Sequence, residues 1–298
     1  MTESYHLRRG TPADARTALD IFVPAVRDLT ARQGQPWEPD LATLWPRMQP
    51  LLEHLAAHAA EWWIAEDAAT GRPIGYARSM KRGGLFELSE FFVVPGSQSA
   101  GVGTALLDRA FPLGRGEVRA IIATTDNRAQ SRYYRAGCSA RFPIAGLEAE
   151  PRLADVPPGL DAVRASSGDI AELCRIEAAV LEFDRGAEFD WLLEQREGYL
   201  YRRDGAAVGF GFIGPGGSGP IASLEADDQA PILAHLERRA AELRLPRLSL
   251  EVPMVNEVAV RHLLARGFQM EPIFTFLMSS RPFGRFDRFI GLSPPFVL

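Results

Sequence analysis

The stretch that decides the fold is FELSEFFVVPGSQSAGVGTALLDRA, residues 86–110. Its first part, Phe86–Val94, is mostly apolar and ends at a Pro-Gly pair, which predicts a strand. Apolar residues then recur at helical spacing, so a loop containing Gly101 and Gly103 joins this strand to a helix. The first amides of a helix have no partner within it, and its dipole adds partial positive charge there. The junction therefore predicts an anion site that the two glycines leave open to close approach.

Length and composition narrow the class of protein. The chain has 298 residues, and at about 150 residues per domain it predicts two domains. Hydrophobic residues make up 46% and charged residues 24%, which is ordinary for a soluble globular protein. The net charge of -5 argues against a dedicated nucleic-acid binder. No apolar run approaches the roughly 18 residues of a membrane span, and the first residues resemble no signal peptide. We therefore expect a cytoplasmic protein with no nucleic-acid or membrane partner.

Several kinds of site lack the residues that they need. Lys81 is the only lysine, and no P-loop pattern surrounds it. A G-x-G-x-x-G pattern at residues 209–214 lies within a strand pattern that no helix follows, so it does not predict dinucleotide binding. His54 and His58 lie four residues apart but not in an H-E-x-x-H motif. We expect no metal site.

The two halves of the chain resemble each other. Three pairs of segments correspond in order: residues 11–14 and 166–169, 62–79 and 198–214, and 126–138 and 256–268. In the first pair both segments are capping-box starts of an amphipathic helix, and in the second both predict strand, turn and strand. A proline-containing stretch, residues 147–160, separates the halves. The sequence therefore predicts a tandem duplication of one α/β unit, with domains at 1–152 and 153–298.

The loop before the helix matches a known pattern at every defined position. It is Val93-x-Pro95-x-x-Gln98-x-x-Gly101-x-Gly103, and it resembles the acyl-CoA signature V-x-P-x-x-[QR]-x-x-G-x-[GA] of the GNAT superfamily of N-acetyltransferases. The resemblance implies the fold class α/β (α+β). It also implies that the chain is a tandem duplication of the GNAT acyl-CoA N-acyltransferase fold. Each half would then be a mixed, mostly antiparallel sheet flanked by helices, in the plan of mycothiol synthase-like proteins.

A second segment, residues 126–138, supports the same resemblance. It is similar to the family's signature N-x-x-A-x-x-L-Y-x-x-x-G-F, which it matches at Ala129, Tyr133 and Gly137. It departs from that signature at Asp126, Arg132 and Cys138. The two signatures occur in the expected order, with the expected spacing.

The resemblance implies acetyl-CoA as co-substrate and no metal. Its pyrophosphate would bind the loop amides, and its pantetheine arm would pair with the preceding strand as an added strand. The cofactor-binding residues implied are Phe91, Phe92, Val93, Gln98, Ser99, Ala100, Gly101, Val102, Gly103, Thr104 and Asp126. An amine would then attack the thioester directly, without an acyl-enzyme.

Two side-chain roles remain, an acid for the departing thiolate and a base for the amine. Anchoring the second signature on Ala129 and Gly137 makes Tyr133 the acid, since a phenol of pKa about 10 can protonate a thiolate whose thiol has a pKa of about 8.5. A competing alignment on Asn127 makes Tyr134 the acid instead. Tyr133 is favoured, and its alternative role is that of a core tyrosine beneath the cofactor.

Glu87 is the first candidate for the base, because it lies eleven residues before Gln98, where several members of the family carry a catalytic glutamate. Glu90 is the second candidate. It lies on the same strand with opposite parity unless a bulge intervenes. If neither acts as the base, both would line the cleft and attract a cationic amine.

The second half lacks the acyl-CoA signature. The corresponding segment places Asp227 and Asp228 near the helix start, where a pyrophosphate would be repelled, and Leu263 replaces the tyrosine. We expect this half to complete the structure or to line the substrate cleft without catalysing acyl transfer.

These features predict an N-acetyltransferase that acts on a primary amine of a small molecule or peptide. The alternative is a non-catalytic acyl-CoA-binding sensor or interaction protein. A transferase that uses charged tRNA would need a basic groove, which the net charge does not favour. The chain would be a monomer or a homodimer.

Overall fold

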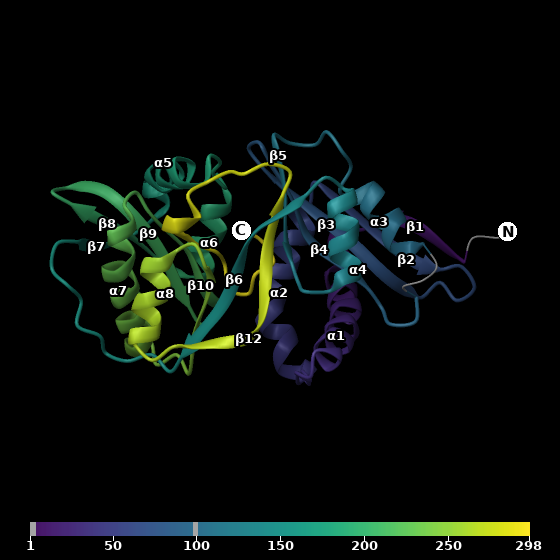
Figure 1. Cartoon of the computed structure of the whole chain (residues 1–298), viewed down its shortest axis with the longest axis horizontal. Helices are drawn as coiled ribbons and strands as arrows, with labels where there is room; N and C mark the ends of the chain where they lie inside the picture. Colours follow the sequence, from purple (N-terminus) through teal and green to yellow (C-terminus); the bar gives the residue numbers. More distant parts are fainter. Residues whose placement is uncertain (1–3, 98–100) are drawn as a thin grey trace. The chain divides into compact units, whose positions relative to one another are not determined.

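The computed structural model describes residues 4–97 and 101–298 and divides into two compact units (Figure 1). The first unit comprises residues 1–121 and 126–139, and the second comprises residues 122–125 and 140–298. Each unit combines β-sheet with helices that cover it. The α/β fold class expected from the sequence is therefore confirmed.

The sheet of the first unit follows the order of the chain. Its strands are β1 (Tyr5–Arg9), β2 (Glu61–Asp67), β3 (Pro73–Arg82), β4 (Leu85–Val93) and β5 (Val118–Ala123). The first four strands pair antiparallel with their neighbours, and β5 pairs parallel with β4. A parallel neighbour needs a crossover connection, and helix α3 (Val102–Ala110) supplies it.

Helices cover both faces of this sheet. They are α1 (Ala15–Arg32), α2 (Leu41–His58), α3 and α4 (Asn127–Arg135). Phe22 of α1 packs edge-on against Phe92 of β4, with ring centroids 5.0 Å apart. The preceding residue, Phe91, packs against Tyr133 of α4 at 6.2 Å. Because successive side chains of a strand point to opposite faces, α1 and α4 lie on opposite sides of β4.

The second unit repeats the order of elements seen in the first half of the chain. Its strands are β6 (Ser139–Ala149), β7 (Asp161–Arg164), β8 (Glu197–Arg203), β9 (Ala206–Gly214), β10 (Gly217–Ser223), β11 (Leu248–Pro253), β12 (Gln269–Ser279) and β13 (Phe289–Ile290). Its helices are α5 (Ile170–Leu181), α6 (Glu188–Gln195), α7 (Gln229–Glu242) and α8 (Glu257–Ala265). Strands β7 to β10 form an antiparallel meander like β1 to β4 and continue into β13. Helices α7 and α8 occupy the positions of α3 and α4 in the order of elements.

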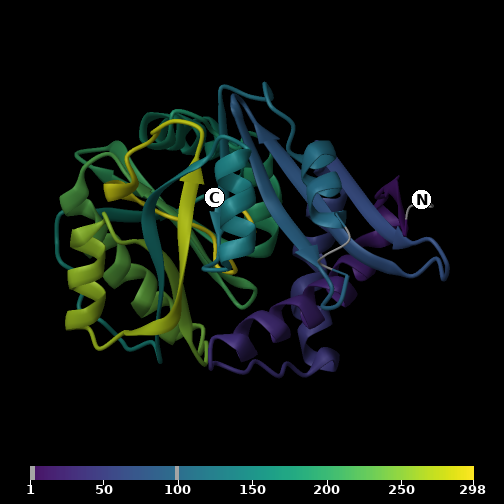
Figure 2. The ribbon, with the colours of Figure 1, turned by 45° about the vertical axis from the view of Figure 1, so that its right-hand side comes forward.

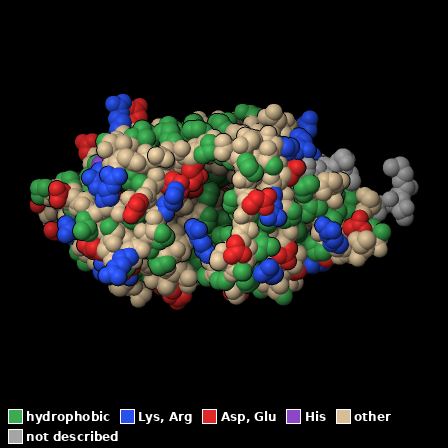
Figure 3. Space-filling view, turned by 90° about the horizontal axis from the view of Figure 1, so that it is seen from below, with side chains coloured by type: hydrophobic (Ala, Val, Ile, Leu, Met, Phe, Trp, Pro, Cys, Tyr) green, Lys and Arg blue, Asp and Glu red, His purple; other side chains and the backbone are tan. Residues whose placement is uncertain are grey.

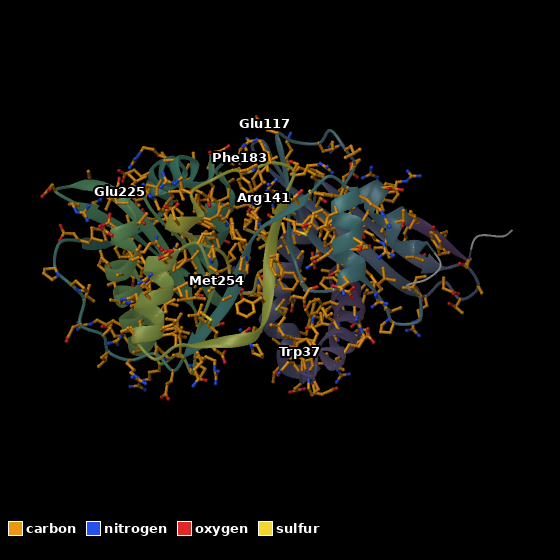
Figure 4. All side chains as sticks on the ribbon, viewed as in Figure 1. Trp37, Glu117, Arg141, Phe183, Glu225 and Met254 are labelled. Carbon is orange, nitrogen blue, oxygen red and sulfur yellow. The ribbon has the colours of Figure 1, made fainter. Side chains whose placement is uncertain are left out.

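Strand β6 lies between two strands of the other half of the sequence. The order is β12-β6-β11, and β6 pairs antiparallel with β11 from Ala149 opposite Leu248 to Ile144 opposite Pro253. The two ribbon views agree that β6 and β12 run side by side (Figures 1 and 2). Arg141 of β6 also donates hydrogen bonds to the hydroxyl and carbonyl oxygens of Ser279, both at 2.8 Å (Figure 4).

Residues 140–152 thus belong to the second compact unit, whereas the sequence predicts them in the first domain. Compact units are defined by contacts and duplicated domains by repeated sequence, so the two kinds of boundary need not coincide. The domain boundary at 152/153 stays a prediction.

The core of the second unit forms on one face of these strands. Ala145 and Leu147 of β6 and Leu250 and Val252 of β11 belong to one cluster of buried apolar residues, which also includes side chains of α7 and α8. On the face of the molecule in Figure 3, acidic and basic side chains of the described residues are interspersed. No helix in the described part of the chain has the length and apolar character that crossing a bilayer requires.

Candidate functional site

Strand β4 loses its parallel neighbour halfway along its length. Its pairing with β5 runs from Leu85 to Leu88 and ends opposite Ile121. Its pairing with β3 continues to Val93. The last residues of β4 are therefore held by β3 on one edge, while the other edge diverges from β5. A polypeptide-like ligand could add to an edge of this kind.

A bulge in β4 sets the direction of the two candidate carboxylates. Arg78 of β3 lies opposite Glu90, but the next residue of β3, Ser79, lies opposite Leu88, which leaves Ser89 as an extra residue. Glu87 lies opposite Met80, two residues along β3 from Arg78. Residues two apart on a strand share a face, so the bulge brings Glu87 and Glu90 to the same face. The bulge that Glu90 needs in order to share the face of Glu87 is therefore present in β4.

Glu90 is held in a buried polar cluster. The hydroxyl of Tyr76 donates a 2.6 Å hydrogen bond to its Oε1 atom, and the Arg78 guanidinium forms an ion pair with Oε2. Arg78 in turn stacks on Trp62, with its guanidinium carbon 4.6 Å from the ring centroid. All four residues are buried. Burial, and then the negative charge of Glu90, raise the pKa of the Tyr76 phenol well above its usual value.

Glu87 is paired in the same way with a different cation. The Nη1 atom of Arg82 donates a 3.0 Å hydrogen bond to its Oε2 atom, and both residues are buried. Both candidate bases are thus carboxylates whose charge an arginine compensates. The structure places them on one face of β4, and the choice between them stays a prediction.

The predicted anion site lies on the other side of β4. Gly101 precedes α3 with a φ of 83°, in the left-handed region that favours glycine. A Cβ atom on Gly103 would lie 3.1 Å from Cζ of Phe91 and 3.5 Å from Nε of Arg132, so only glycine fits there without displacing a neighbour. Among the described residues, none accepts a hydrogen bond from the amide of Val102 or Gly103. These donors and the Arg132 guanidinium suit a phosphate group.

Other predicted cofactor residues divide into two groups. Gln98, Ser99 and Ala100 lie outside the described residues. The amide of Thr104 donates to the carbonyl oxygen of Gly101 at 3.0 Å, so it closes the first turn of α3.

Asp126, the last predicted cofactor residue, caps α4. Its Oδ1 atom accepts hydrogen bonds from the amides of Arg128 at 2.9 Å and Ala129 at 3.4 Å, and Oδ2 pairs with Arg32 at 3.1 Å. Burial acts to raise the pKa of this carboxyl, but the hydrogen bonds from Arg128 and Arg32 outweigh it and hold the pKa below its usual value. The geometry gives Asp126 a capping role, and its binding of a cofactor stays a prediction.

Tyr133 lies beneath the predicted anion site. It is buried and packs edge-on against Phe91, which also contacts the Gly103 position. Burial raises the pKa of this phenol above its usual value, the charge of Asp126 adds to the effect, and Arg132 opposes it. The alternative, Tyr134, is 54% exposed. The structure thus brings Gly103, Phe91 and Tyr133 together.

Sequence reasoning missed the partners of Glu90 and the position of Arg132. Arg78 occurs in an otherwise apolar strand pattern, GYARSM, and a charged residue in such a run signals a buried partner. Arg132 departs from the apolar residue of the family signature, and the structure places it over Gly103.

The second half places a carboxylate where the first half has its anion site. Asp228 lies at the start of α7, is buried, and forms an ion pair with Arg203. Leu263, at the tyrosine position, belongs to the apolar core. Within the described ranges, no group of three His, Cys, Asp or Glu side chains could hold a metal ion.

Comparisons with known proteins agree with this geometry. The family model "Acetyltransferase (GNAT) family" matches residues 23–138. A putative acetyltransferase structure from Pyrococcus horikoshii is similar to the chain, with a TM-score of 0.74 at 15% identity over 97% of this chain and 94% of that one. A GCN5-related N-acetyltransferase structure from Sphaerobacter thermophilus gives a TM-score of 0.62 at 14% identity, over 95% and 98% of the two chains.

A tandem GNAT protein from the clavulanic acid biosynthesis pathway has a TM-score of 0.57 at 16% identity, over 93% of this chain and 99% of that one. No curated protein sequence matches the chain. Likeness at these identities shows the fold, which extends over nearly the whole chain. The segment that matches the acetyltransferase (GNAT) family model, residues 23–138, includes β4, α3 and Tyr133.

Proposed function

We propose that the first half of the chain binds acetyl-CoA and transfers its acetyl group to a primary amine by direct attack. The observation that carries the proposal is the divergence of β4 from β5 after Leu88, on the strand that leads to the start of α3. The acceptor is an amine of a small molecule or of a peptide. The match of residues 23–138 to the acetyltransferase (GNAT) family model supports acyl transfer from an acyl-CoA as the reaction class.

The residues present fit such a co-substrate. The amides of Val102 and Gly103, with the Arg132 guanidinium beside them, would hold the pyrophosphate. The main chain of Phe91–Val93 would pair with the amide groups of the pantetheine arm as an added strand. No metal takes part in this proposal.

The chemistry needs two proton transfers. The attacking amine forms a C–N bond as the C–S bond of the thioester breaks, and the ammonium proton passes to a carboxylate, directly or through water. Glu87 and Glu90 share one face of β4, and either could be that carboxylate. Tyr133 would donate its proton to the departing thiolate. Its raised pKa keeps the phenol protonated at neutral pH.

Substitution of Tyr133 tests the acid. We expect Tyr133→Phe to lower kcat about 100-fold, within the range for loss of a general acid, with little change in the KM for acetyl-CoA. Thiol release in a screen of primary amines would measure both constants. Tyr134→Phe is the matched control, because the neighbouring tyrosine is exposed and its loss should leave kcat unchanged. Equal kcat values for Tyr133→Phe and the wild type would exclude this role.

Substitutions of the two carboxylates assign the base. Glu87→Gln and Glu90→Gln should differ in kcat, and the larger loss identifies the residue that receives the amine proton, provided that circular dichroism shows both variants folded. A folded wild type that binds acetyl-CoA but acetylates no amine would instead favour the non-catalytic sensor.

A further inference from the structure

The last residues of the chain run between β10 and β11 of the second unit. Strand β13 pairs antiparallel with β10, with Ile290 opposite Ile221 and Phe289 opposite Ala222. Further along, the amide of Ser293 donates to the carbonyl oxygen of Ser218 at 3.0 Å. On its other side the segment reaches β11, because the amide of Gly291 donates to the carbonyl oxygen of Glu251 at 3.2 Å. We call residues 289–298 the tail segment.

The corresponding strands of the first unit are β4 and β5. By the order of elements, β10 corresponds to β4 and β11 to β5, since each pair flanks one helix after an antiparallel meander. β4 and β5 pair directly as far as Leu88 and then diverge. β10 instead takes β13 as its neighbour on the edge away from β9. In the first unit an interval opens between the end of β4 and β5. In the second unit the tail segment occupies the corresponding interval, between β10 and β11.

Strand β10 is adapted to the close approach of the tail segment. A Cβ atom on Gly217 would collide with the carbonyl oxygen of Ser293, and one on Gly219 would collide with the carbonyl oxygen of Gly291. Glycine at both positions lets the two backbones come together. The register shifts in both strands, but β4 carries glutamates at this stage, whereas β10 has mostly small residues, GSGPIAS.

Buried polar side chains hold the main chain of the tail segment. Arg196 donates to the carbonyl oxygen of Ser293 at 3.1 Å, and Asn256 donates to that of Phe289 at 3.4 Å. Arg185, which is ion-paired with buried Glu177, donates to the main-chain oxygen of Leu298 at 2.9 Å. These three side chains therefore already donate to the main chain of the tail segment.

Apolar burial is equally extensive along the tail segment. Phe289 and Ile290 are 0% exposed, and Leu298 is 2% exposed. Burial of side chains of this size is a main source of folding stability. An added strand of pantetheine would have to displace this whole segment.

We propose that the tail segment fills the interval between β10 and β11 of the second unit and thereby prevents an acyl-CoA from binding there. The chain then binds one acyl-CoA, in its first half, and the second unit depends on its tail segment for stability. That the excluded ligand is an acyl-CoA rests on the proposed function. The position of the tail segment between β10 and β11 is independent of the proposed function.

Hydrogen exchange tests the position of the tail segment directly, on the full chain and without any ligand. We expect the amides of Gly291 and Ser293 to exchange as slowly as those of the neighbouring strand β9, because both donate within the sheet. Residues 151–157, which have no regular structure, serve as the fast-exchanging reference. Exchange of the tail amides at the rate of that reference would overturn the proposal, whether or not the chain binds acetyl-CoA.

Removal and replacement of the tail segment provide a second test. A chain ending at Arg288 should lose thermal stability, and a synthetic peptide of residues 289–298 should restore it saturably. The same peptide with Ile290→Asp is the matched control and should not restore it, because Ile290 is fully buried. A truncated chain as stable as the full chain would contradict the proposal.

The third measurement is calorimetric titration of acetyl-CoA into the full chain. One site per chain is expected, and Gly101→Glu should abolish it by placing a carboxylate at the start of α3. Two sites per chain would overturn the closure of the second unit. Binding at no site would contradict the proposed function, and the exchange and peptide measurements would still decide the proposal on the tail segment.

Discussion

The ion pair between Glu90 and Arg78 has fully buried side chains on both partners. Removing one charge of such a pair leaves the other without compensation, which costs about 3 to 5 kcal/mol. We therefore expect Glu90→Gln to lower the free energy of unfolding by about 3 kcal/mol, measured by urea denaturation. The double variant Glu90→Gln/Arg78→Met removes both charges and should recover most of that loss. An unchanged urea midpoint for the single variant would show that the pair is not buried as described.

Glu251 of β11 is a partly buried carboxyl whose charged neighbour is another carboxyl, that of Glu271. It lies opposite Gly146 of β6. Burial, and then the charge of Glu271, raise its pKa from 4.5 to about 8. The folded state therefore binds the proton more tightly than the unfolded state. The stability that this group contributes is fully present below pH 4.5 and is lost as the pH rises toward 8.

Glu251→Gln should remove this dependence. At pH 9 we expect the variant to be more stable than the wild type by at least about 1 kcal/mol, since one pKa unit corresponds to about 1.4 kcal/mol. Thermal melts at pH 5, 7 and 9 would measure it. Parallel stability curves for the two proteins would contradict the raised pKa.

Helix α4 connects the two sides of the candidate site at the level of secondary structure. Its N-cap, Asp126, pairs with α1 through Arg32, while Arg132 reaches Gly103 at the start of α3. If the proposed function holds, Arg132→Leu should weaken acetyl-CoA binding about 3- to 10-fold, or about 1 kcal/mol. The effect should shrink in 0.5 M salt, because exposed charges are then screened. Arg135→Leu, an exposed arginine of the same helix, is the control and should bind as the wild type does. Equal weakening by both substitutions would indicate a general charge effect rather than a contact.

The second unit depends on a strand from the first half of the sequence. β6 lies between β12 and β11, and its Ala145 and Leu147 are buried in the core of that unit. A fragment of residues 153–298 lacks this strand and should show no cooperative thermal unfolding. A fragment of residues 140–298 contains it and should unfold cooperatively at a higher temperature. Circular dichroism melts of the two fragments measure the difference, and equal melts would show that β6 is dispensable to the unit.

The sequence was sufficient for the parts of the site that depend on neighbouring residues. The strand that ends before Pro95, the glycine-containing loop and the helix from Val102 follow from local patterns, and the structure contains all three except for the undescribed residues 98–100. The sequence could not predict the partners of Glu90. Arg78 lies twelve residues away, and only the bulge at Ser89 aligns the two side chains across neighbouring strands.

By itself, the sequence predicted the family resemblance and the tandem order of elements, because periodicity, turn residues and short motifs act within a few residues of the chain. The tertiary structure alone decided that Glu87 and Glu90 share a face, that β6 lies between β12 and β11, and that the tail segment lies between β10 and β11. Each of these depends on strand register and on pairing between residues distant in sequence. A single inserted residue reverses the face that a side chain occupies, and no local pattern records which distant strand will provide the partner.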